Sequence, residues 1–140
     1  MLPFKLVLDT NIIISAHLKP EGLERAVLNF ALTPPALMFV SKAILKEYQN
    51  VLKRPKFKID PTDSANAIKL ISTRAVLLKP PVRLNITLDP DDNIFLECAQ
   101  AARADYLATG NQKHFPAFWR NTKIINSREL MKIIAPHQYG

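Results

Sequence analysis

The chain has 140 residues, 48% of them hydrophobic, which suits one domain with one core (residues 1–140) and excludes a disordered chain. Its net charge of +7 and pI of about 9.7 favour polyanionic partners such as nucleic acid. No apolar run reaches the roughly 18 residues of a membrane helix. The first residues also lack the regions of a signal peptide, so we expect a cytoplasmic protein with no membrane attachment.

Several catalytic motifs are absent from the sequence. Three glycines in the whole chain are too few for a Walker A loop or a dinucleotide-binding fingerprint. The three histidines form no H-E-x-x-H pair, and no G-x-S-x-G elbow is present. The single Cys98 cannot form an internal disulfide, and its apolar neighbours place it in the core. Any chemistry is therefore expected to depend on carboxylates.

The chain begins with a short apolar run that ends in an acid. Leu6–Leu8 predicts a buried parallel strand, followed by Asp9 and by a helix from near Asn11 to Leu18. Ligands of open α/β sheets gather at the carboxyl ends of the strands. Because Asp is also a preferred N-cap residue, Asp9 alone is either a helix cap or part of a site.

Strands and helices then alternate along the chain. Strands are predicted at residues 37–40, 75–79, 106–108 and 123–126, and helices at 23–32, 42–53, 61–74, 91–102 and from a cap at Ser127. This alternation predicts an α/β fold with a parallel sheet covered on both faces. The apolar face of the second helix, with Leu23, Val27 and Phe30, is either core or a homodimer face. The tail after Ala135 is expected to be loose.

Four polar residues lie where a strand meets a helix, or on a helix that faces that edge. Asp9 and Asn111 directly follow strands, Asp92 lies in the first turn of a helix, and Glu47 lies on the helix after the second strand. Oxygen ligands that converge at one edge suit Mg²⁺ or Mn²⁺. These ions stabilise charge on phosphate esters and activate water.

Each acid also has a structural explanation. Asp89-Pro90-Asp91-Asp92 is an ideal helix start, and Asp60-Pro61-Thr62-Asp63 repeats its pattern. Taken alone, Asp92 is better explained as a helix cap than as a ligand, and Glu47 as a solvated acid. The case for a site depends on the whole set and its order along the chain.

That ordered set resembles the PIN domain (PilT N-terminus-like), the nuclease fold of many bacterial and archaeal toxins of toxin–antitoxin systems, as in VapC-like proteins. The stretches that carry the resemblance are LDTNI at residues 8–12, Glu47, DPDDNIFLECA at residues 89–99 and ADYLATGN at residues 104–111. Together they span most of the chain.

The resemblance implies a three-layer α/β/α sandwich around about five parallel strands, and a metal-dependent endoribonuclease. Asp9, Glu47 and Asp92 would be catalytic and would hold Mg²⁺ or Mn²⁺ together with Asn111. Thr10, Asn11 and Thr109 would support the site. Metal-activated water would attack an RNA phosphodiester and leave 5′-phosphate and 3′-hydroxyl ends, and a partner antitoxin would block the acidic cleft.

Asn111 departs from the family pattern, which usually has an acid there. Asn keeps one oxygen ligand and loses the negative charge, so a second metal is expected to bind weakly. Asp105 lies at the other end of its strand, and Glu97 lies about five helical positions from Asp92, so neither is expected to replace the missing acid. The change favours the alternative of a catalytically weak or inactive module that binds RNA or an antitoxin.

Two further alternatives concern chemistry and RNA. A phosphohydrolase with a nucleophilic Asp commonly has a second acid two residues on, where this chain has Asn11. A basic stretch contains Phe57 and four cations, and it is either an RNA-binding surface or a solvated loop. The cations are Lys53, Arg54, Lys56 and Lys58, and the next candidates are Lys113, His114 and Arg120. Phe118 and Trp119 are expected to pack, not to stack on bases.

Overall fold

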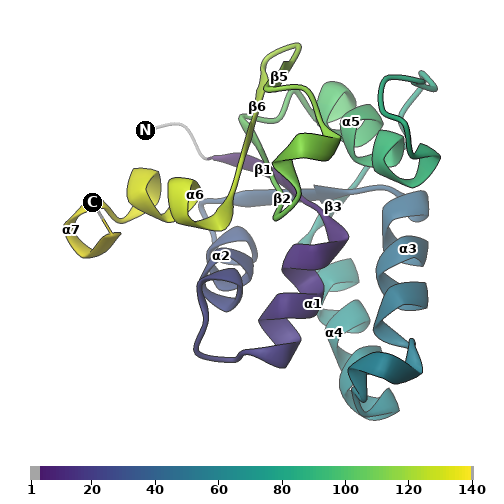
Figure 1. The fold of residues 1–140 in the computed structure, drawn as a ribbon, viewed down its shortest axis with the longest axis vertical. Helices are drawn as coiled ribbons and strands as arrows, with labels where there is room; N and C mark the ends of the chain where they lie inside the picture. The colour runs from purple at the N-terminus through teal and green to yellow at the C-terminus, as the bar shows by residue number, and fades with distance from the viewer. Residues whose placement is uncertain (1–3, 140) are drawn as a thin grey trace.

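A computed structural model, which describes residues 4–139, contains a six-stranded sheet in the order β3-β2-β1-β4-β6-β5 (Figure 1). The strands are β1 (Lys5–Leu8), β2 (Leu37–Val40), β3 (Val76–Leu77), β4 (Tyr106–Ala108), β5 (Phe118–Trp119) and β6 (Thr122–Ile125). All neighbours pair in parallel except β5, which runs antiparallel to β6. The predicted parallel sheet is confirmed, with β5 as an additional edge strand too short to show a pattern in the sequence.

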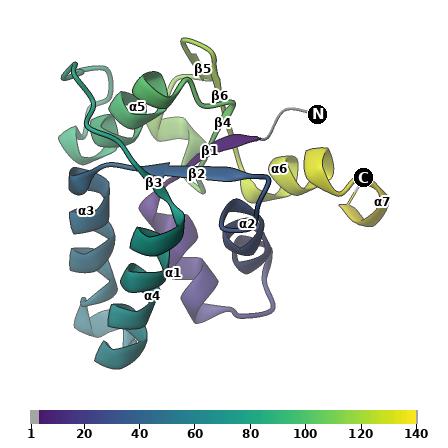
Figure 2. The same ribbon diagram turned by 180° about the vertical axis from the view of Figure 1, so that it is seen from behind.

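The helices form the two outer layers. They are α1 (Thr10–Leu18), α2 (Leu23–Ala31), α3 (Lys42–Leu52), α4 (Pro61–Arg74), α5 (Pro90–Ala102), α6 (Ser127–Ile134) and α7 (Pro136–Tyr139), with 3₁₀ turns η1 (Pro55–Phe57) and η2 (Gln112–His114). Helices α1–α4 lie on one side of the sheet and α5 on the other (Figures 1 and 2). The fold is the predicted α/β/α sandwich. No helix within residues 4–139 is long and apolar enough to cross a membrane.

The core is centred on β1 and β4. Leu6, Leu8 and Leu107 are fully buried, because both strands have neighbours on each edge and helices over each face. Cys98 on α5 is buried in the same cluster, as predicted. On α2, Val27 is fully buried and the rest of its apolar face packs against the core. In this chain, that face is part of the core.

Two expectations at the C-terminal end are wrong. Asn126, not Ser127, caps α6: its Oδ1 accepts from the backbone N–H of Glu129 at 2.8 Å, and the Glu129 carboxylate accepts from the N–H of Asn126 at 3.0 Å. The tail after Ala135 is not loose. It forms α7, which begins at Pro136 and places Tyr139 against the core.

Candidate active site

A cavity of about 540 Å³ lies at the carboxyl ends of β1 and β4, where α1 and α5 begin and α3 passes. Five carboxylates line it, together with two amides, an imidazole and two cations: Asp9, Glu47, Asp89, Asp91, Asp92, Asn11, Asn111, His114, Arg54 and Lys56. The structure therefore brings the four predicted polar residues to one place, although the set spans about a hundred positions of the sequence.

Hydrogen bonds hold the side chain of Asp9 in place in this cavity. Its side chain is only 5% exposed. Oδ1 accepts a hydrogen bond from the backbone N–H of Thr10 at 2.7 Å, and Oδ2 accepts from the Thr109 hydroxyl at 2.6 Å and from Asn11 Nδ2 at 3.1 Å. Asn11 Oδ1 in turn accepts from the N–H of Gly110 at 3.0 Å. Asp9 is therefore both the cap of α1 and a wall of the cavity, and these contacts tie the ends of β1 and β4 together.

The environment of Asp9 disfavours its charged form. Burial raises the pKa of the Asp9 carboxyl above its ordinary value, and the hydrogen bonds from Thr109 and Thr10 partly offset this rise. A carboxylate has about four lone-pair sites, so three hydrogen bonds leave it able to accept another partner. A nearby positive charge would favour the ionised form.

Thr10 contributes a buried, unpaired polar atom beside this cavity. The residue lines the cavity and is 8% exposed. Within residues 4–139 its hydroxyl oxygen is one of two buried side-chain polar atoms that lack a hydrogen-bond partner. Because an unpaired buried hydroxyl is costly, this position lowers the stability of the fold.

At the start of α5, one acid caps the helix and another has a free carboxylate at the cavity. Asp89 caps the helix by accepting from the N–H of Asp91 at 3.0 Å, which leaves the carboxylate of Asp92 free. Burial, followed by the charges of Asp9 and Asp89, raises the pKa of Asp92 to about 6. The helix start is thus explained without Asp92, whose surroundings are those of a site residue.

Glu47 is held at the cavity by its neighbour on α3. The fully buried Tyr48 donates its hydroxyl hydrogen to the carbonyl oxygen of Leu8, the last residue of β1. Burial and the charge of Asp91 raise the pKa of Glu47, and Arg54 opposes this rise. Glu47 is therefore coupled to the other acids and is not an isolated solvated carboxylate.

The acids surround the cavity without meeting at one point. Within residues 4–139, no group of three His, Cys, Asp or Glu side chains is placed to hold a metal ion. Asp9 is fixed by three hydrogen bonds, whereas the side chains of Glu47 and Asp92 form none among the described residues. The donor chemistry suits a hard divalent cation, and the two free side chains are the ones able to adjust to it.

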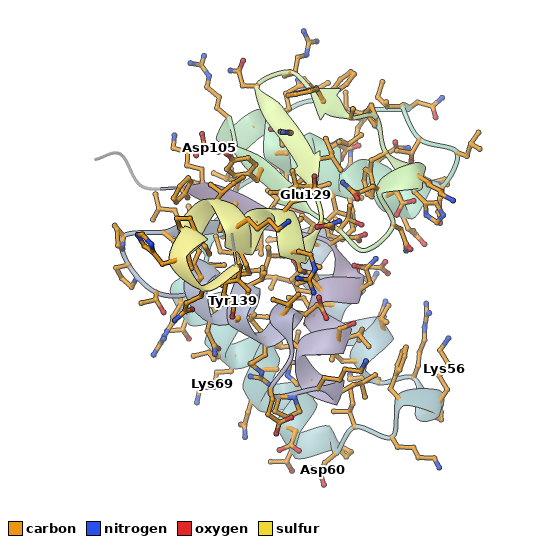
Figure 3. The ribbon with its side chains drawn as sticks, turned by 60° about the vertical axis from the view of Figure 1, so that its left-hand side comes forward. Lys56, Asp60, Lys69, Asp105, Glu129 and Tyr139 are labelled. Atoms are coloured by element: carbon orange, nitrogen blue, oxygen red, sulfur yellow. The ribbon has the colours of Figure 1, made fainter. Side chains whose placement is uncertain are left out.

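The residues considered as replacements for an acid at position 111 have other contacts. Asn111 lines the cavity, and its backbone N–H donates to the Thr109 hydroxyl at 2.9 Å. Asp105 accepts from the N–H of Lys5 at 2.8 Å, at the amino-terminal end of the sheet (Figure 3). Glu97 accepts from the N–H of Leu84 at 2.9 Å. The expectation that neither acid reaches the site is confirmed.

Only some of the cations in the basic stretch after α3 line the acidic cavity. Arg54 and Lys56 line the acidic cavity together with Phe57, and Lys56 projects outward from η1 (Figure 3). Lys53 lines a separate pocket beside α4, and Lys58 lines a groove on the α4 side. That groove, about 640 Å³, is larger than the acidic cavity, but its only acids are Asp60 and Asp63.

Sequence reasoning did not place three of the cavity residues there. The sequence predicts Asp89 and Asp91 as parts of a helix start, and it places His114 only among the further candidates for RNA contact. His114 Nδ1 lies 3.6 Å from Asp92 Oδ2. Its position three residues after Asn111, on the same short turn, is a signal that could have identified it.

The two aromatic residues of β5, Phe118 and Trp119, have different surroundings. Trp119 packs against the core, and its indole N–H donates to Gln100 Oε1 at 2.9 Å, as expected of a packing residue. Phe118 is 60% exposed, so the expectation that it packs is wrong. As an edge strand with one partner, β5 turns alternate side chains to opposite faces. The Arg120 guanidinium lies over the Trp119 ring, 5.4 Å from its centroid, away from the cavity.

The cavity acids lie at the carboxyl ends of a mostly parallel sheet that is enclosed between helical layers. This arrangement defines a class of protein, the PIN domain. Residues 5–113 match the PIN domain, and the chain belongs to the PIN domain family. It is 28% identical over 114 residues to an uncharacterized protein, MJ1680, from Methanocaldococcus jannaschii, covering 79% of this chain and 73% of the relative.

Two solved structures share the fold. A chain of VapBC2 from Rickettsia felis, bound to a DNA fragment from its promoter, has a TM-score of 0.57 at 17% identity, covering 88% of this chain and 98% of that one. A chain of VapBC-1 from nontypeable Haemophilus influenzae has a TM-score of 0.60 at 20% identity, covering 89% and 98%. The α/β/α architecture implied by the sequence resemblance is thereby confirmed.

Proposed function

We propose that this PIN domain is a metal-dependent endoribonuclease that hydrolyses RNA phosphodiester bonds at the acidic cavity. The observation that carries the proposal is the convergence of Asp9, Glu47 and Asp92, from three different elements, on one cavity. The pKa values of all three carboxyls are raised, and perturbed carboxyl groups that gather in one cavity are typical of functional sites. Membership of the PIN domain family supports the same function.

Asp9, Glu47 and Asp92 would hold Mg²⁺ or Mn²⁺, since both ions prefer oxygen ligands. When bound, the ion would neutralise charge on the phosphate and lower the pKa of a water molecule. Asp9 would contribute a preorganised carboxylate, because Thr10, Asn11 and Thr109 fix its orientation. Arg54 and Lys56, at the rim, would bind flanking phosphates.

The proposal is tested by RNA cleavage assays with Mg²⁺, with Mn²⁺ and with EDTA. We expect cleavage with either ion, no cleavage in EDTA, and products with 5′-phosphate and 3′-hydroxyl ends. Asp92→Asn, purified in parallel, identifies a contaminating nuclease. Cleavage that persists unchanged in EDTA or in this variant would contradict the proposal.

Asn111 supports a second candidate function, a catalytically weak or inactive module that binds RNA. This residue lines the cavity but brings no charge, and no three acids are placed to hold an ion among the described residues. Asn111→Asp should tighten Mn²⁺ binding by about tenfold, because a carboxylate adds a charged oxygen ligand. Calorimetric titration measures this change. An unchanged affinity would remove Asn111 from the site.

We also propose that the chain is the toxin of a toxin–antitoxin pair and that a cognate antitoxin covers the acidic cavity. The support is the likeness of its fold to chains of the VapBC structures. Expression of the wild-type chain should arrest bacterial growth, and expression of Asp92→Asn at the same level should not. Equal growth in both cultures would contradict a toxin role.

A further inference from the structure

His114 reaches the acidic cavity without any evident structural task. Its side chain is 59% exposed, and Nδ1 lies 3.6 Å from Asp92 Oδ2, beyond ordinary hydrogen-bond distance. Among residues 4–139, its imidazole forms no hydrogen bond. It is also not packed in the core, unlike Phe115, the next residue. Neither packing nor capping therefore explains an imidazole at this position.

The turn that carries His114 is nevertheless well anchored. Phe115 is buried, and its backbone N–H donates to the carbonyl of Gln112 at 3.1 Å. The N–H of His114 donates to the carbonyl of Asn111 at 2.9 Å. The Gln112 side chain donates to Glu129 Oε1 at 2.8 Å, which ties the turn to α6. These contacts hold an exposed imidazole at a defined place beside the acids, as a preorganised binding group requires.

Charge around the cavity is distributed unevenly. Glu47 lies on α3, and Asp89, Asp91 and Asp92 lie at the start of α5, whereas the η2 turn brings the Asn111 amide and the His114 imidazole to the cavity. A phosphate that approaches the carboxylates needs hydrogen-bond donors beside them. Imidazole presents a ring N–H in its neutral form as well as in its protonated form. Hydrogen bonds to charged groups are stronger than those between neutral groups.

We propose that His114 is a substrate-contacting residue, whose ring N–H donates a hydrogen bond to a phosphate oxygen of bound RNA beside Asp92. This inference rests on the proposed function, because it takes RNA as the ligand of the same cavity. It adds to that function a contact from the η2 turn, beside the carboxylate of Asp92 on α5.

The test compares His114→Ala and His114→Gln with a matched control, His137→Ala, which makes the same substitution elsewhere. His137 is an exposed residue that does not line the cavity. Binding of a single-stranded RNA oligonucleotide in EDTA is measured by fluorescence anisotropy, so that neither cleavage nor metal contributes. Mn²⁺ binding without RNA is measured by calorimetry, and single-turnover cleavage with Mg²⁺ is measured separately.

We expect His114→Ala to weaken RNA binding by about tenfold, the effect of one lost hydrogen bond to a charged group. His114→Gln keeps an N–H donor and should stay within about threefold of the wild type, as should His137→Ala. Mn²⁺ affinity should be the same in all four proteins. Unchanged RNA binding in His114→Ala would overturn the inference. So would a loss of Mn²⁺ affinity, which would make the imidazole a metal ligand, or a wild type that does not bind RNA.

Failure of the inference is distinguishable from failure of the proposed nuclease. If the wild type binds RNA without cleaving it and His114→Ala loses that binding, the inference stands and the nuclease is contradicted. If the wild type cleaves and His114→Ala binds and cleaves equally well, the nuclease stands and the inference is contradicted.

Discussion

The two D-P-x-D segments of this chain form the same local structure in different surroundings. At α4, Asp60 accepts from the N–H of Thr62 at 2.8 Å, and at α5, Asp89 accepts from the N–H of Asp91 at 3.0 Å. In both segments a proline follows the capping Asp at the first helical position. The short sequence pattern is therefore sufficient to begin a helix in either place.

The fourth residue of each segment shows the difference. Asp63 is exposed and lines the groove beside α4, and it does not line the acidic cavity. Asp92 is only 16% exposed and stands beside the end of β1, where burial and the charge of Asp9 raise its pKa to about 6. Capping depends on the adjacent residues, whereas the chemistry of the fourth residue depends on what the fold brings next to it.

The largest expected difference between the two segments is catalytic. Asp92→Asn should lower the rate of RNA cleavage by at least about a hundredfold, because it removes a charge that acts on the reacting phosphate. Asp63→Asn makes the same chemical change at the matching position and should leave the rate within about twofold. Single-turnover cleavage rates with Mg²⁺ measure both variants. Equal losses in the two would show that the segments do not differ in function.

The basic stretch provides a second version of this comparison. Arg54→Ala combined with Lys56→Ala should weaken RNA binding by roughly tenfold, and it should reduce the slope of log affinity against log salt by about 1.4. Lys53→Ala combined with Lys58→Ala also removes two charges, but neither residue lines the acidic cavity. Its salt dependence should change less. If the control pair shows the larger change in slope, RNA runs along the α4 side instead.

The raised pKa of Asp92 predicts an effect on stability that Asp63 should not share. With a pKa of about 6, folded Asp92 holds its proton over a pH range in which the unfolded chain has released it. The free energy of unfolding should therefore fall as the pH rises from about 4 to 6. In EDTA at pH 7, Asp92→Asn should be more stable than the wild type by about 1 kcal/mol, after allowance for solvent screening.

This stability difference should disappear near pH 4, and Asp63→Asn, at an exposed position, should not be stabilised at either pH. Denaturant titration at the two pH values measures the free energies of unfolding. A variant that is equally stabilised at pH 4 and pH 7 would mean that the change reflects packing and not the charge of Asp92.

The smallest expected difference concerns the caps themselves. Asp60→Ala and Asp89→Ala should each lower the free energy of unfolding by about 1 kcal/mol, because each removes one N-cap hydrogen bond. The two losses should agree within about 0.5 kcal/mol. Thermal and denaturant unfolding of the two variants checks this agreement. A much larger loss at one helix would show that its cap has a tertiary role as well.

The positions of strands and helices were largely predictable from the sequence, because they depend on local patterns. The start of α4 at Pro61, the strand Leu37–Val40 and the order of acids along the chain follow from apolar runs, prolines and capping residues. The edge strand β5 was not predictable, since two residues show no periodicity and the pairing with β6 is a tertiary contact. The cap of α6 was assigned one residue too late, because Asn126 and Ser127 are both favourable cap residues.

The sequence by itself also determined which residues could form a site: the positions of Asp9, Glu47, Asp92 and Asn111 relative to the predicted strands and helices singled them out, and the family pattern supported the choice. Only the tertiary structure decided what each one contacts. It assigned the cap of α5 to Asp89, left Asp92 free, placed His114 beside it and separated Arg54 and Lys56 from Lys53 and Lys58. The physical reason is that capping acts between neighbouring residues, whereas burial and charge coupling depend on distances that only the packing of β1, α3, α5 and η2 establishes.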